Sequence, residues 1–107
     1  MPSNPPRPPH PGDLIKTIRL LAGQGKLKFT THASDERMDE RDIGFSDVHE
    51  ILRRGNIEGA ITPGRRAGEW RCLVVGKLDW TTREAGVATI VVRRDHLVIV
   101  TVEWMDL

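Results

Sequence analysis

The side chains best suited to chemistry lie in one charged segment, FTTHASDERMDERDIGFSDV, which covers residues 29–48. His32 follows two threonines in this segment, and a neutral imidazole can act as a general base near pH 7. Arg37 and Arg41 are four residues apart, so on a helix they project from one face and can hold a phosphate between them. One base and two cations supply much of what phosphodiester chemistry needs.

The charge pattern predicts a helix over about residues 34–42, which Thr31 or Ser34 can cap. If Ser34 is the cap, His32 precedes the helix and lies close to its partly positive end, which favours a neutral imidazole. A second interpretation is also open, in which His32 only caps or packs and the arginines form ion pairs along a solvated helix. The acidic side chains available for such pairs are Asp35, Glu36, Asp39, Glu40 and Asp42.

Other motifs argue against a metal or cofactor site. The four histidines and the single cysteine, Cys72, never fall into the spacing of a metal-binding motif. The sequence contains neither a glycine-rich phosphate loop nor a GxSxG nucleophile motif. We therefore expect neither a metal nor a cofactor.

A second candidate surface is basic. Two arginine pairs, at residues 65–66 and 93–94, could lie together and bind the phosphates of RNA. Trp70 or Trp104 could stand beside them and stack on a base. The alternative is that both tryptophans belong to the core or to an interface.

The composition is that of one soluble globular domain. The chain has 107 residues, of which 38% are hydrophobic and 29% charged, and its net charge of +1 neither requires nor excludes binding to nucleic acid. With a single cysteine no intrachain disulfide can form, and no apolar run is long enough to span a membrane. These features predict a cytoplasmic protein.

Six of the seven prolines fall within residues 1–12, which predicts an extended arm followed by a single domain over residues 13–107. Apolar residues at helical spacing after Asp13 and after Ser46 predict two further helices, with these two residues as caps. Residues 26–30 form a short strand or an extended link. After Gly55 the sequence contains runs that are typical of β-strands: IEGAIT, WRCLVVG, GVATIVVRR and HLVIVTVEW. We predict an α+β fold whose helices pack on one face of an antiparallel sheet of three or four strands.

The pattern as a whole resembles a small bacterial family, the domain of unknown function 4258. The resemblance covers about residues 14–105 and includes the motifs FTxHA and RMxERxI, followed by a helix that contains DV and by a glycine. The residues that carry it are Phe29, Thr30, His32, Ala33, Arg37, Met38, Glu40, Arg41, Ile43, Asp47, Val48, Gly55, Thr101 and Val102.

That family is similar to the RelE, BrnT and barnase-like ribonuclease superfamily, which implies N-terminal helices against a curved antiparallel sheet. The resemblance also implies metal-independent RNA cleavage, in which the 2′-hydroxyl attacks the adjacent phosphate. His32 would be the base or acid, Arg37 and Arg41 would hold the phosphate, and Thr101 would line the same cleft from the last strand. A second acid or base is also needed, and three residues are candidates for it: His49, His96 and Glu36.

Many members of that superfamily look like toxins of toxin–antitoxin pairs, so the resemblance implies RNA as substrate and an antitoxin protein as partner, and leaves the oligomeric state open. The alternative function is a non-catalytic module of the same fold that binds a partner protein or nucleic acid. An enzyme is expected to gather His32, Arg37 and Arg41 around one cleft, whereas a binding module can scatter them.

Overall fold

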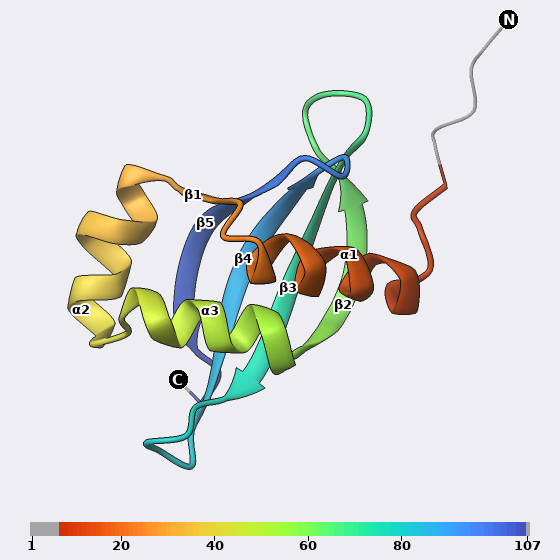
Figure 1. The fold of residues 1–107 in the computed structure, drawn as a ribbon. Coiled ribbons are helices and arrows are strands. Elements are labelled where there is room, and N and C mark those ends of the chain that lie inside the picture. Colours follow the sequence, from red (N-terminus) through yellow and green to blue (C-terminus); the bar gives the residue numbers. More distant parts are fainter. Residues whose placement is uncertain (1–6, 107) are drawn as a thin grey trace, which may run out of the picture.

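The computed structural model describes residues 7–106, apart from the side chains of residues 35–37. Three helical segments and five strands follow one another in the order α1, β1, η1 with α2, α3, and β2 to β5. Figure 1 shows α1 and α3 on one face of the sheet, with η1 and α2 beside its β1 edge. The fold is α+β, as predicted.

Helix α1 covers Pro11–Gly23. Its cap is His10, whose Nδ1 accepts a hydrogen bond of 3.0 Å from the backbone N–H of Gly12. The prediction of Asp13 as the cap is wrong, because the helix starts at Pro11, three residues earlier than predicted. Proline suits this first position, since it has no N–H that needs a partner and its φ is already fixed near the helical value. Of the expected arm, the last two residues belong to α1, and residues 1–6 lie outside the described residues. The buried side chains of α1 are those predicted: Leu14, Ile15, Ile18, Leu21 and Ala22.

The second helical segment is η1, a π-helix over His32–Met38, continued by α2 over Asp39–Arg41. It begins two residues before the predicted start at residue 34, so His32 lies in its first turn rather than ahead of it. Asp42, with a positive φ of 54°, ends the segment. The side chains of Ala33 and Met38 fix it to the core.

Helix α3 covers Phe45–Arg54. Its cap position is Gly44, so the prediction of Ser46 as the cap is wrong. The carboxylate of Asp47 accepts a hydrogen bond of 2.9 Å from the N–H of Gly44, which tightens this turn from inside the helix. Gly55 follows the last residue of the helix, and a Cβ at this position would lie 2.6 Å from two carbonyl oxygens. Because glycine has no Cβ, the backbone can pass this close and α3 leads directly into the sheet.

The sheet has five strands in the order β1-β5-β4-β3-β2. Strands β2 (Asn56–Pro63), β3 (Glu69–Lys77), β4 (Glu84–Val92) and β5 (His96–Trp104) pair in antiparallel fashion, as predicted. Strand β1 (Leu27–Phe29) runs parallel to β5, so the prediction of a purely antiparallel sheet of three or four strands is wrong. The outer edge of β5 offers unpaired backbone groups, and the short chain that returns from α1 pairs with them.

The core fills the space between the helices and the inner face of the sheet. Val74, Val87 and Ile99 point into it from β3, β4 and β5 and are fully buried. The alternate positions point to the outer face, where Leu73, Ala88 and Thr101 lie in one row and are partly exposed. Thr101 therefore belongs to the face of the sheet opposite α1 and α3.

Candidate functional site

His32 is held at strand β5 by the threonine two residues before it. The backbone N–H of Thr30 donates a hydrogen bond of 3.1 Å to the carbonyl of Ile99. The hydroxyl of Thr30 donates a second bond, also of 3.1 Å, to the carbonyl of Val100. Because both bonds lie so close to His32 along the chain, they fix the start of η1 against β5.

Thr30 is also the cap of η1. Its hydroxyl oxygen accepts a hydrogen bond of 3.1 Å from the backbone N–H of Ala33, so the prediction of Thr31 or Ser34 as the cap is wrong. This cap explains the early start of the helix and leaves His32 exposed in the first turn. The sequence signal for it was the second residue of the FTxHA motif, a threonine directly after an alternating strand.

Thr101 directly follows Val100, to which Thr30 bonds, and strand β5 contains a bulge at this point. Ala88 of β4 pairs with Thr101, but the next residue, Thr89, pairs with Ile99, so Val100 is an extra residue without a partner on β4. The carbonyl of Val100 is the one that accepts the Thr30 hydroxyl. Bulges of this kind are frequent next to active sites, where they redirect a side chain. The structure thus brings the backbone of His32 beside the part of β5 that carries Thr101.

Arg41 lies at the other end of the same helical segment. The nine residues from His32 to Arg41 span up to about 14 Å at 1.5 Å per residue. The guanidinium of Arg41 forms an ion pair of 3.3 Å with Glu40, and its Nε is buried without a hydrogen-bond partner among the described residues. The side chain of Arg37, the remaining predicted phosphate ligand, lies outside the described residues. The structure therefore fastens Thr30, two residues before His32, to β5 next to Thr101, and it places Arg41 at the other end of the helical segment.

The surroundings of Arg41 fasten the end of the chain to α2. The indole N–H of Trp104 donates a hydrogen bond of 2.9 Å to the carbonyl of Arg41. Trp80 packs edge-to-face on Trp104, with ring centroids 5.8 Å apart, and the guanidinium of Arg83 lies 4.1 Å from the centre of the same ring. Two hydrogen bonds of 2.8 and 2.9 Å join Arg83 to Asp106 and lower the pKa of this carboxyl group. This cluster, which the sequence analysis missed, has a structural role.

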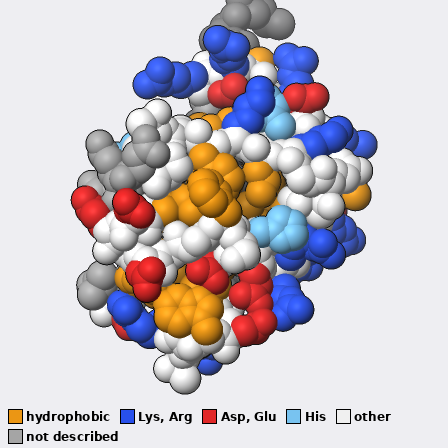
Figure 2. Space-filling model, turned by 60° about the vertical axis from the view of Figure 1, so that its left-hand side comes forward, with side chains coloured by type: hydrophobic (Ala, Val, Ile, Leu, Met, Phe, Trp, Pro, Cys, Tyr) orange, Lys and Arg blue, Asp and Glu red, His pale blue; other side chains and the backbone are white. Residues whose placement is uncertain are grey.

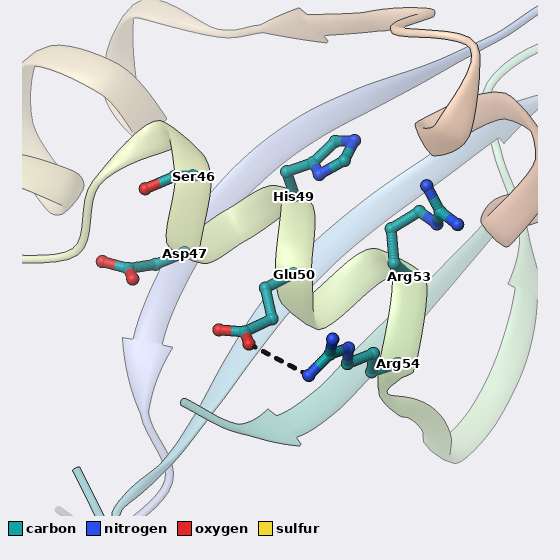
Figure 3. A pocket seen from close by; sticks show the side chains of 6 residues that line it. All are labelled: Ser46, Asp47, His49, Glu50, Arg53 and Arg54. Atoms are coloured by element: carbon teal, nitrogen blue, oxygen red, sulfur yellow. Dashed lines mark ion pairs between the residues drawn. The ribbon is translucent and has the colours of Figure 1, made fainter. Parts of the chain in front are cut away.

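A depression of about 470 Å³ lies over the exposed side of α3 (Figure 3). All of its lining residues come from this one helix: Ser46, Asp47, His49, Glu50, Arg53 and Arg54. Figure 3 shows Glu50 pointing toward Arg54, with which it forms an ion pair of 3.5 Å. His49 lies 3.0 Å from the carbonyl of Ala22 through its Nε2, so it joins α3 to α1. His49 thus has a structural contact of its own, on the helical side of the sheet.

The other candidates for a second acid or base lie elsewhere. His96 starts strand β5, at the end opposite Trp104, and its Nδ1 lies 2.6 Å from the carboxylate of Asp95. The side chain of Glu36 lies outside the described residues. Burial raises the pKa of the Cys72 thiol to about 11, so this cysteine stays protonated at neutral pH and cannot act as a nucleophile.

The loops that carry the two arginine pairs lie together, at the β4–β5 end of the sheet. The backbone N–H of Arg93 donates a bond of 3.0 Å to the carbonyl of Gly68, which joins the two loops. A Cβ at Gly68 would lie 2.9 Å from the Arg93 side chain. The φ of this residue is +84°, a conformation that glycine adopts more easily than other residues. Figure 2 shows Lys and Arg side chains mainly at the top and right of the molecule. Trp70, next to Glu69 at the start of β3, stands near these loops, whereas Trp104 ends β5 on the far side.

Comparison with known protein families shows to which of them the chain belongs. Residues 29–104 match the family described as domain of unknown function DUF4258. The chain belongs to the DUF4258 family. No curated protein and no solved structure was found to match it. The DUF4258 match runs from Phe29, the last residue of β1, to Trp104. It therefore includes His32, Arg41 and Thr101, whereas α1 lies before it.

The described residues contain no group of three or more His, Cys, Asp and Glu side chains that could hold a metal ion. Within the same residues, none of the helices has the length and apolar character required to cross a membrane.

Proposed function

We propose that this DUF4258 protein is a small ribonuclease that cleaves RNA through the 2′-hydroxyl, and that it acts as the toxin of a toxin–antitoxin pair. The observation that carries the proposal is an exposed His32, fixed by Thr30 to the bulge of β5 beside Thr101. The arrangement of N-terminal helices against an antiparallel run of four strands agrees with a RelE, BrnT or barnase-like fold.

The reaction needs a base, an acid and stabilisation of the phosphate. His32 takes the proton from the 2′-hydroxyl as its oxygen forms a bond to phosphorus. The bond from phosphorus to the 5′-oxygen breaks, and this oxygen receives a proton from water or from a second acid. The hydroxyl of Thr101 donates to a non-bridging oxygen, where charge develops. The products are a 2′,3′-cyclic phosphate and a 5′-hydroxyl end.

A row of cations supports RNA as the substrate. The joined loops at the β4–β5 end carry both arginine pairs, and β1 begins beside them, because the N–H of Leu97 bonds to the carbonyl of Lys26. Lys26, just before β1, and Lys28, on this edge strand, are both exposed, and the strand leads to Thr30 and His32. A strand of RNA with its phosphates on this row would reach His32 at its end.

One observation favours the alternative of a non-catalytic module that binds RNA or a partner protein. Arg41, a proposed phosphate ligand of the enzyme, lies at the opposite end of the helical segment from His32 and is paired with Glu40. A binding protein can use the basic row without assembling a cleft. Where RNA is the ligand, the two functions therefore differ only in whether the bound RNA is cut.

The test is incubation of purified protein with end-labelled RNAs of varied sequence in the presence of EDTA. The ribonuclease proposal predicts cleavage that EDTA does not abolish and products that end in 2′,3′-cyclic phosphate. Cleavage that disappears with EDTA would point to a metal and refute the proposed chemistry. Binding of RNA without any cleavage would assign the protein to the non-catalytic alternative.

A further inference from the structure

A pocket of about 380 Å³ lies between the second half of α1 and the β4–β5 hairpin. It is separate from the His32 site, and α1, which supplies most of its wall, lies before the region that matches the family. The lining residues are Lys16, Thr17, Leu20, Leu21, Gln24, Lys26 and Arg94.

The floor of this pocket is aliphatic. Leu20 is the most exposed of the large hydrophobic side chains described, with 61% of its surface accessible, whereas Leu21 beside it is buried in the core. One exposed leucine is common on protein surfaces. Leu20 stands out because it lines a pocket whose rim is charged.

The rim of the pocket is cationic. Lys16, Lys26 and Arg94 line it together, and no acidic residue does. None of the three forms an ion pair within the described part of the chain. The hydrogen bond with His96, at 2.6 Å, is the main cause that lowers the pKa of Asp95, and the charge of Lys26 contributes less. Among the described residues, the three cations around the aliphatic floor therefore form no ion pair with a carboxylate.

We propose that this pocket binds a segment of a partner protein in which an aliphatic side chain is flanked by carboxylates. The aliphatic side chain would cover Leu20, and the carboxylates would pair with the three cations, which is the complementarity of an amphipathic segment in a groove. RNA fits this pocket less well, because single-stranded RNA is usually held by aromatic stacking and the lining contains no aromatic residue. The inference stands whether or not the protein cleaves RNA.

The first step of the test is selection from a phage library of random 12-residue peptides on the full-length protein. Counter-selection uses Leu20→Gln, whose exposed position makes misfolding an improbable cause of lost binding. The peptides that bind the wild type but not this variant should be enriched in Asp and Glu around Leu, Ile or Val. Thermal unfolding of both proteins checks that the variant is folded.

The second step measures the affinity of the most enriched peptide by fluorescence anisotropy. Leu20→Gln and Arg94→Glu should each weaken binding roughly tenfold, as expected for a buried anchor and for a reversed charge in an interface. The matched controls are Phe45→Gln, an exposed apolar residue on α3, and Lys77→Glu, an exposed cation on β3, and both should leave the affinity unchanged.

Three results would overturn the inference. The first is a selection that yields no peptide dependent on Leu20. The second is enrichment of peptides without acidic residues. The third is a single-stranded RNA whose own affinity falls with Leu20→Gln as much as the affinity of the peptide does, which would make the pocket a nucleic-acid site.

Discussion

The two ends of the helical segment made by η1 and α2 are both fastened to strand β5, but in opposite ways. At the first end the fastening residue is Thr30, whose small side chain makes two hydrogen bonds and leaves His32 exposed. At the second end Trp104 bonds to the carbonyl of Arg41 and is itself covered by Trp80 and Arg83. The first arrangement keeps the imidazole of His32 accessible, and the second buries apolar surface. We therefore propose that the first end carries the function and that the second contributes stability.

The largest effect should come from removing Trp104, which is 7% exposed. Trp104→Ala should lower the free energy of unfolding by about 3–5 kcal/mol, the usual cost of deleting a buried aromatic side chain. Urea denaturation followed by circular dichroism measures this change. Trp80→Ala is the matched control, and its loss should be much smaller because Trp80 is 56% exposed. Equal losses for both variants would contradict the role given to Trp104.

A smaller effect is expected at the Thr30 end. Thr30→Val keeps the shape of the side chain but removes both hydroxyl bonds, and it should lower the free energy of unfolding by about 1–2 kcal/mol. Thr31→Val changes an exposed neighbour and should stay within about 0.5 kcal/mol of the wild type. If RNA is cleaved, Thr30→Val should also slow cleavage at a pH and temperature where the variant is folded. A variant with normal stability would show that Thr30 does not anchor the helix.

The smallest effect should be a pH dependence at the chain end. Hydrogen bonds from Arg83 hold the pKa of Asp106 below its ordinary value of 3.8, so the unfolded chain binds this proton more readily than the folded protein. The contribution of Asp106 to stability is therefore complete above that ordinary value and is lost as the pH falls through the lowered pKa. Asp106→Asn should reduce the urea midpoint at pH 7, and the difference from the wild type should shrink on acidification. A difference that is constant with pH would contradict this pairing.

Periodicity was sufficient to predict α1, α3 and the strands of the antiparallel run. The apolar residues of α1 recur at helical spacing, and the alternation after Gly55 is typical of strands rich in valine and isoleucine. The parallel pairing of β1 could not be predicted, because three residues carry no information about their partner or direction. The same segment made the sheet mixed rather than antiparallel.

The candidate site was only partly accessible to sequence analysis. His32 and Thr101 could be named from side-chain type and motif, but the hydrogen bond that fastens Thr30 to β5 is made at the extra residue Val100, whose bulge has no local sequence signal. The separation of Arg41 from His32 follows from the early cap at Thr30 and the length of the helical segment. The pairing of Trp80 with Trp104 joins distant parts of the chain, so only the fold reveals it.

The most direct test compares RNA cleavage by three proteins under identical conditions: the wild type, His32→Ala and Arg41→Ala. The account predicts that His32→Ala lowers kcat by roughly 10²–10⁴-fold, the usual contribution of a general acid or base. Arg41→Ala should lower it by less than about tenfold, because a charge at the far end acts only through screened attraction. Equal cleavage by the wild type and His32→Ala, or an equal loss in both variants, would contradict the division of the helical segment into a functional and a structural end.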